Sequence, residues 1–245
     1  MDLRQDAVIV RTKNIGNDRC IWLLTEKEGV VSLFLKSAGS VKSKFASSTQ
    51  LFCCGEAVLF KNKDKYSLNS FDLQDSHFKL QSDLLKLSLA SYFCEAICDV
   101  SSMGDGSEEY LSLIKNSLYL VEKGNKNPKL IKAVFEMRLM VLAGFMPDIV
   151  NCSACDEVLP KEIYFNIEEG LCLCKECHKG SNEGFYLPSP VVDSLRHIIF
   201  SDRKKIFSFC ISDENLDILE RFCEVYFLYH VGRSFKTLEF YRSLL

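Results

Sequence analysis

The alternation of apolar and polar positions changes along the chain at about residue 80. Before that point, short runs rich in β-branched and aromatic residues alternate with turn residues, a pattern that predicts strands. The expected strands cover residues 7–12, 20–25, 30–36, 51–61 and 66–71. The tight connection at Glu28-Gly29 predicts that the second and third strands form a hairpin. Five short strands joined by short turns favour a small closed β-barrel of the OB type.

Beyond residue 80 the apolar positions recur at helical spacing. Helices are expected over residues 84–100, 108–121, 127–144, 189–200, 214–231 and 234–245, whereas 206–211 is ambiguous. Asn127 is suited to cap a helix in which Pro128 takes the first position. The predicted fold class is therefore α+β. An OB-fold domain would cover residues 1–80, and a mostly helical domain 81–245 would carry a metal-binding module at about 148–180.

Composition is that of an ordinary soluble protein, with 245 residues, 47% hydrophobic and 26% charged. No apolar run approaches the roughly 18 residues that suggest a membrane span. The N-terminus lacks the pattern of a signal peptide, so a cytoplasmic protein without disulfides is expected.

Four of the twelve cysteines form two pairs with metal-ligand spacing. Cys152 and Cys155 are followed, after 18 intervening residues, by Cys174 and Cys177. Two C-x2-C pairs at this separation are typical of a tetrahedral zinc site, and four thiolates leave no open position for catalysis. The sequence therefore predicts a structural Zn²⁺ ion held by these four residues.

Other interpretations of the cysteines remain open at this stage. Cys172 or His178 could replace one of the four ligands. The C-x-x-C-H run at 174–178 also fits haem attachment, and either pair fits a redox motif. The haem interpretation leaves the first pair without a role and needs export, and the redox interpretation lacks the expected strand–helix setting. The remaining cysteines other than Cys172 lie in apolar surroundings and are expected in the core, namely Cys20, Cys53, Cys54, Cys94, Cys98, Cys210 and Cys223.

Positive charge gathers near the N-terminus although the whole chain carries −3. Residues 1–65 have a balance of +4, and the rest has −7. A polar loop at 37–50 is flanked and crossed by basic and aromatic residues. Lysine and arginine side chains can follow phosphates while aromatic rings stack on bases, and Phe34, Phe45 and Phe52 are candidates for stacking. The alternative is a solvated loop. The candidate DNA-binding residues are Arg11, Lys13, Arg19, Lys36, Lys42, Lys44 and Phe45.

No catalytic motif occurs in the chain. Phosphate-binding glycine loops, a nucleophile elbow and a zinc-protease helix are all missing from the sequence. The sequence therefore predicts a binding protein that is not an enzyme.

The order of several motifs resembles the RecO family of DNA repair proteins along essentially the whole chain. The resemblance rests on A-x-V-x-R-T at 7–12, Gly16 with Asp18-Arg19, and Lys42-Ser43-Lys44-Phe45. It continues with Ala-Gly-Phe-Met-Pro at 143–147 directly before the first cysteine pair, and with F-x4-G-x3-C-x2-C at 165–177. The chain departs from the family pattern in having Gly170-Leu171 where a glycine pair is frequent, and in a less basic loop.

The resemblance implies an N-terminal OB-fold, a helical domain and a zinc module. It also implies binding of single- and double-stranded DNA, annealing of complementary strands, and loading of RecA together with RecR and single-stranded-DNA-binding protein. A cytoplasmic, nucleoid-associated protein without membrane contact would follow. By this resemblance Arg11, Arg19, Lys42 and Lys44 occupy basic DNA-binding positions. An RNA-binding OB/zinc protein and a scaffold for an acidic protein tail are the alternatives that the same residues would serve.

Overall fold

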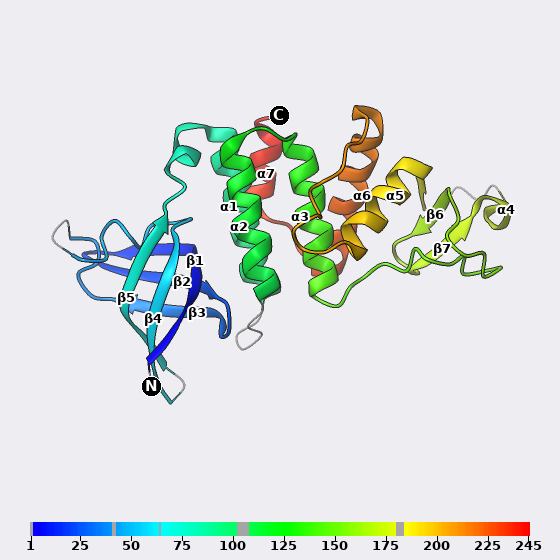
Figure 1. Cartoon of the computed structure of the whole chain (residues 1–245). Coiled ribbons are helices and arrows are strands. Elements are labelled where there is room, and N and C mark those ends of the chain that lie inside the picture. The colour runs from blue at the N-terminus through cyan, green and yellow to red at the C-terminus, as the bar shows by residue number, and fades with distance from the viewer. Residues whose placement is uncertain (1, 41–42, 64, 102–107, 180–183) are drawn as a thin grey trace. The chain divides into compact units, whose positions relative to one another are not determined.

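The computed structural model describes residues 2–40, 43–63, 65–101, 108–179 and 184–245. Its contacts group into two compact units, which Figure 1 shows from the blue N-terminus to the red C-terminus. The first comprises Met1–Asn125 with Phe235–Leu245, and the second comprises Lys126–Ser234. The domain boundary at residue 80 expected from the sequence stays a prediction.

The first unit begins with a five-stranded antiparallel sheet of order β3-β2-β1-β4-β5. Its strands are β1 (Asp2–Ile15), β2 (Asp18–Thr25), β3 (Gly29–Leu35), β4 (Cys54–Asn62) and β5 (Lys65–Asp75). All five predicted strands are thus present, and the β2–β3 hairpin is confirmed. The two edge strands, β3 and β5, contact each other, but no hydrogen-bonded ladder joins them among the described residues. A closed OB barrel therefore stays a prediction.

Alternation along the strands gathers the main core on one face of the sheet, although Val8 and Leu24 of the other face are also buried. In β3, for example, Val31, Leu33 and Leu35 are buried, whereas Ser32 and Phe34 are exposed. Successive side chains of a strand point to opposite faces, so the buried set gathers on one side. This core consists of Ala7, Ile9, Ile21, Leu23, Val31, Leu33, Leu35, Ala38, Cys53, Ala57, Leu59, Leu68 and Phe71.

Helices complete the first unit. They are the 3-10 helix η1 (Phe78–Ser82), α1 (Leu84–Val100), α2 (Glu108–Lys123) and α7 (Lys236–Ser243). Asp83 caps α1 by accepting the backbone N–H groups of Leu85 and Lys86. The C-terminal α7 packs beside α1, where Thr237 donates to Glu95 at 2.6 Å (Figure 1). The expected cap of α2, Ser107, lies outside the described residues.

Three helices form the body of the second unit: α3 (Pro128–Leu142), α5 (Ser189–Phe200) and α6 (Asp213–Val231). As predicted, Asn127 caps α3 by accepting the N–H of Lys129, and Pro128 is its first residue. Between α3 and α6 the buried ammonium of Lys132 lies within 3.2 Å of carboxylates of Glu136, Glu220 and Glu224.

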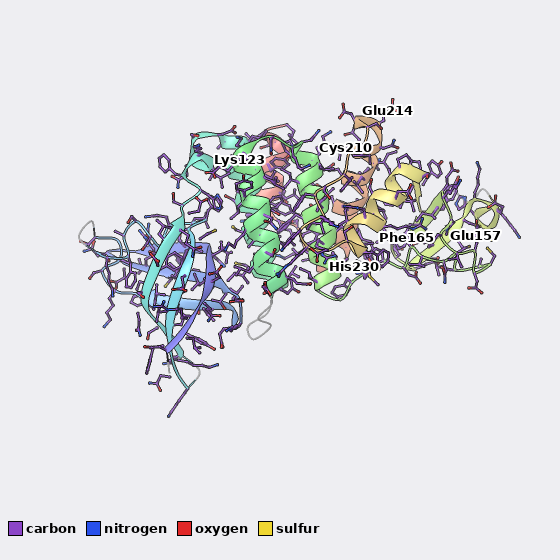
Figure 2. All side chains as sticks on the ribbon, in the orientation of Figure 1. Lys123, Glu157, Phe165, Cys210, Glu214 and His230 are labelled. Atoms are coloured by element: carbon purple, nitrogen blue, oxygen red, sulfur yellow. The ribbon has the colours of Figure 1, made fainter. Side chains whose placement is uncertain are left out.

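A small module lies between α3 and α5. It contains β6 (Ile163–Asn166), β7 (Leu171–Cys174), the short helix α4 (Lys175–His178) and β8 (Phe185–Leu187), with sheet order β7-β6-β8. Phe165 of β6, labelled in Figure 2, belongs to this module. Its ring packs edge-on against Phe222 of α6, with ring centroids 5.5 Å apart. The module is therefore attached to the helices by its own apolar face.

Two expectations need correction. Residues 206–211 form turns and irregular backbone, so the ambiguous segment is neither helix nor strand. The prediction that all seven remaining cysteines are core residues is confirmed for the buried Cys53, Cys54, Cys94 and Cys223, whereas Cys20 and Cys98 are only half-buried. It is wrong for Cys210, which lies in this segment and is exposed. Its neighbours supply no regular element that would bury it. Across the described residues, helices of the length and apolarity needed to cross a membrane are not found.

Candidate nucleic-acid interface and metal centre

A β-bulge sets which face of the sheet Arg11 occupies. Ile9 pairs with Leu23, but the register then shifts at Val10 so that Arg11 pairs with Trp22. Without the extra residue, Arg11 would share the inward face of Ile9, because side chains alternate. The bulge therefore turns Arg11 outward, where its guanidinium lies 4.7 Å from the centre of the Trp22 ring.

The same outer face continues across three strands. Lys13 of β1 pairs with Cys20 of β2, which in turn pairs with Phe34 of β3. Residues directly opposite each other in a ladder share a face. Phe34 is 53% exposed, and the exposed Lys36 lies in the turn that directly follows β3, beside this face. Two rows thus bring positive charge and aromatic surface together; we call Arg11, Lys13, Trp22, Phe34 and Lys36 the basic outer face.

Arg19 lies on the opposite side of β2 and is only 6% exposed. Its guanidinium donates to Asn14 Oδ1 at 3.0 Å, to Thr49 Oγ1 at 3.0 Å and to the carbonyl oxygens of Ala46 and Thr49 at 3.2 and 3.3 Å. These bonds join β2 to the loop that precedes β4. Arg19 therefore holds the loop, and the sheet does not present it with the other basic residues.

The loop between β3 and β4 carries the remaining candidates. Lys44 is exposed, donates from Nζ to the carbonyl oxygen of Asn69 at 2.8 Å, and lies 4.8 Å from the centre of the Phe45 ring. Phe45 packs partly against the core of the sheet. Phe52 is 1% exposed, so the expectation that it could stack on a base is wrong: its ring fills the interior. Lys42 lies outside the described residues.

The four cysteines predicted as metal ligands come together in the second unit. Their sulfur atoms all lie within 4.8 Å of one another, and Cys155 Sγ is 3.8 Å from Cys174 Sγ. Four thiolates about 2.3 Å from a tetrahedral zinc ion would be about 3.8 Å apart. Cys152, Cys155, Cys174 and Cys177 therefore lie close enough together to hold a soft tetrahedral cation.

Backbone amides surround the sulfur atom of Cys152, one of these four cysteines. The N–H of Cys174 donates to Cys152 Sγ at 3.3 Å. Burial raises the pKa of the Cys152 thiol, but hydrogen bonds from the amides of Cys174, Ala154 and Cys155 outweigh burial and lower this pKa to about 6. The thiolate, the form that binds metals, is thus favoured at Cys152. Glu157, labelled in Figure 2, closes the first loop by accepting the N–H of Cys152 through its carbonyl oxygen at 2.9 Å.

The two alternative ligands have other roles. Cys172 is buried outside the four-sulfur group, and burial raises the pKa of its thiol to about 11. Its backbone exchanges hydrogen bonds with Ser153, which ties the first pair to β7. His178 stacks on Tyr164 with centroids 3.5 Å apart and likewise stands outside the group. The geometry therefore groups the four predicted cysteines and leaves Cys172 and His178 outside the group, while their role as metal ligands stays a prediction.

Sequence reasoning missed two features of these sites. Trp22 was not among the candidate residues, although the alternation of β2 places it opposite Ile21 and Leu23. The three short strands around the cysteines were not predicted, because each contains four residues or fewer.

The chain is thus a mixed α and β protein, with an N-terminal antiparallel sheet followed by helices and a module that holds four clustered cysteines. Comparison with known proteins gives the family: residues 1–77 match the Recombination protein O N-terminal family, and residues 81–239 match the Recombination protein O C-terminal family. The chain belongs to the RecO family of DNA repair proteins.

Relatives match over nearly their full length. The DNA repair protein RecO of Acetivibrio thermocellus is 29% identical over 99% of this chain and 97% of its own. That of Clostridium novyi is 28% identical over 97% of this chain and 93% of its own. The sequence-based assignment to this family is confirmed.

Proposed function

We propose that this protein is a non-enzymatic recombination mediator that binds single- and double-stranded DNA, anneals complementary strands and assists RecA loading with RecR and single-stranded-DNA-binding protein. The observation that carries the proposal is the basic outer face, found on a member of a DNA repair family. Cations on β1 sit beside aromatic rings on β2 and β3, the combination that single-strand binders use.

Annealing follows from the same arrangement. Arg11, Lys13 and Lys36 neutralise phosphates, while Trp22 and Phe34 hold a few bases and leave the others accessible to a second strand. Strand pairing needs charge neutralisation and no bond chemistry, which accords with a protein that is not an enzyme. Lys42, Lys44 and Phe45 of the loop between β3 and β4 contribute a separate contact with DNA, and Arg19 keeps the described part of that loop in place.

Zinc has a structural role in this proposal. Cys152, Cys155, Cys174 and Cys177 hold a single Zn²⁺ that joins the loop after α3 to β7 and α4. A closed set of four thiolates stabilises the module and supplies no open coordination position. The closed OB barrel and a cytoplasmic, nucleoid-associated location belong to the same proposal.

Binding of a labelled single-stranded oligonucleotide at increasing salt tests the function. Each phosphate neutralised on a single strand contributes a slope of about −0.7 to log K against log salt. A steep slope together with faster annealing of complementary strands supports the proposal. Salt-independent binding, or no acceleration of annealing, contradicts it. Competition by single-stranded RNA of the same sequence separates the alternative, an RNA-binding OB/zinc protein, which would prefer the RNA.

A further inference from the structure

A second cluster of metal-ligating side chains lies where the chain leaves the sheet for the helices of the first unit. It consists of Asp75, the last residue of β5, His77, which precedes η1, and Glu122, one residue before the end of α2. One ligand atom of each lies within 4.8 Å of the others. The cluster joins segments that are 45 residues apart in the sequence.

The distances suit a small divalent cation. His77 Nδ1 is 3.1 Å from Glu122 Oε2 and 3.9 Å from Asp75 Oδ2. Nitrogen and oxygen ligands about 2.0–2.2 Å from a metal lie about 3 Å apart at right angles and about 3.4 Å apart in a tetrahedron. A shift of about 0.5–1 Å by the Asp75 carboxylate would bring its Oδ2 to such a distance from His77 Nδ1.

Backbone amides orient both carboxylates. The second oxygen of Asp75 accepts the N–H of His77 at 2.9 Å, and the second oxygen of Glu122 accepts the N–H of Lys79 at 3.1 Å. Each carboxylate therefore keeps one oxygen on the protein and directs the other at the same imidazole nitrogen. Hydrogen bonds of this kind from outside the ligand set orient the ligands of protein metal sites.

The burial and the charge of these three side chains favour the binding of a cation between them. His77 is 3% exposed and the Glu122 side chain is 14% exposed, whereas the Asp75 side chain, at 53%, leaves a route of entry. The nearby ammonium of Lys86 donates to the backbone carbonyl of Glu122 at 3.0 Å, not to its carboxylate. The two carboxylates together supply the negative charge that a divalent ion balances.

We propose that Asp75, His77 and Glu122 form a second metal site, for a divalent cation of the Mn²⁺ or Zn²⁺ type, with water in the remaining positions. One nitrogen and two oxygen ligands differ in softness from the four thiolates, so the two sites select metals differently. The bound ion fixes the end of β5 to α2 and thereby holds the sheet against the helices of the first unit.

Titration of the purified full-length chain with Mn²⁺ alone tests the site. The cysteine cluster is first loaded with zinc, and free Mn²⁺ is followed by its electron paramagnetic resonance signal. Carboxylate and imidazole ligands suit Mn²⁺, whereas thiolates do not, so the expected result is one Mn²⁺ bound per chain. The melting temperature of the chain should rise with added Mn²⁺, because the ion binds only the folded state.

His77→Asn is the informative variant. His77 has φ 47°, and asparagine tolerates this left-handed conformation while its amide can keep a donor near the position of Nδ1. The fold and the bond to Glu122 should survive, and Mn²⁺ affinity should fall more than tenfold. Asp75→Asn should act likewise. The control is Asp72→Asn, an exposed carboxylate of the same strand outside the cluster, which should bind as the unchanged protein does.

Two results would overturn the proposal. In the first, the unchanged chain binds neither Mn²⁺ nor a second equivalent of Zn²⁺; the cluster is then a hydrogen-bonded contact of His77 with Glu122 and holds no metal. In the second, His77→Asn binds Mn²⁺ as tightly as the unchanged chain, which would assign the binding to other carboxylates such as Glu157 and Glu176.

Discussion

The basic outer face and the four-cysteine cluster reach their geometries by opposite routes. Each cysteine pair is held by a local turn, and β7 with α4 brings the second pair to the first within one small module. The outer face needs three strands in register and a bulge at Val10 to gather its side chains. The cluster is thus a local structure that a metal can complete, whereas the face exists only when the whole sheet is formed.

The two regions also differ in how their energy is distributed. A metal centre concentrates free energy in four bonds, so the loss of one ligand is expected to remove most of it. A DNA-binding face adds contributions of roughly similar size from each charge and each ring, so single changes there are small. Variants of the two regions should therefore differ in kind, one set acting on stability and the other on affinity.

The largest effect is expected from Cys152→Ser. The hydroxyl is a poor zinc ligand, so bound zinc should fall from one to nearly zero per chain, and several kcal/mol of stability should be lost, lowering the melting temperature by about 10 °C. Metal analysis and thermal unfolding check this. Cys210→Ser, at an exposed thiol, is the control and should change neither quantity. If the Cys152→Ser protein still bound one zinc ion per chain, the loss of one ligand would not remove the metal-binding energy, and the expected difference between the two regions would be refuted.

The combined change of Arg11, Lys13 and Lys36 to alanine tests the other region. Three lost phosphate contacts at about 0.7 decade each predict roughly 100-fold weaker binding of single-stranded DNA in 0.1 M salt, and a slope against log salt that is smaller by about 2. The melting temperature should hold, because all three side chains are exposed. The control replaces three exposed lysines outside the basic outer face with alanine, namely Lys63, Lys65 and Lys204. Equal losses in both triple variants would mean that binding follows total charge and not this face.

Two arginines, Arg19 and Arg11, distinguish an effect on stability from an effect on DNA affinity. Replacing Arg19 with methionine removes the guanidinium bonds to the carbonyl oxygen and Oγ1 of Thr49, although Gln50 Nε2 still donates to the carbonyl oxygen of Ala46 at 2.7 Å. The loss of these buried bonds should cost about 2 kcal/mol in the free energy of unfolding. Arg11→Met is the matched change at an exposed arginine and should lower DNA affinity while unfolding in urea is unaltered. If Arg19→Met instead left unfolding unchanged and reduced the salt slope, Arg19 would belong with the DNA-binding residues.

The same difference between local and long-range structure explains how much of each region could be predicted from the sequence. The spacing of Cys152, Cys155, Cys174 and Cys177 carries its own geometry, and Asn127-Pro128 carries the start of α3, because both depend on neighbours in the chain. Strand positions were also readable from local alternation.

The face of each strand was harder to predict. The alternation of Arg19 with Ile21 and Leu23 does indicate its inward position. Arg11 could not be placed in this way, because its alternation with Ile9 is broken by the bulge at Val10. A bulge depends on the pairing of two strands, and that information is not contained in either strand alone.

The smallest expected effect, at Phe34, distinguishes a stacking surface from a merely basic one. Phe34→Ala should weaken binding of single-stranded DNA roughly fivefold to tenfold, because stacking on one base contributes about 1–3 kcal/mol and part of the surface remains in Trp22. Duplex DNA keeps its bases stacked inside the helix, so its affinity should not change. Stability should alter by less than about 0.5 kcal/mol, since the ring is 53% exposed. Phe60→Ala, at an exposed ring on β4 outside the basic outer face, is the control measured in parallel by fluorescence anisotropy. Equal weakening by Phe34→Ala and Phe60→Ala, or equal weakening on single strands and duplex, would leave charge as the only contribution of this face to DNA binding.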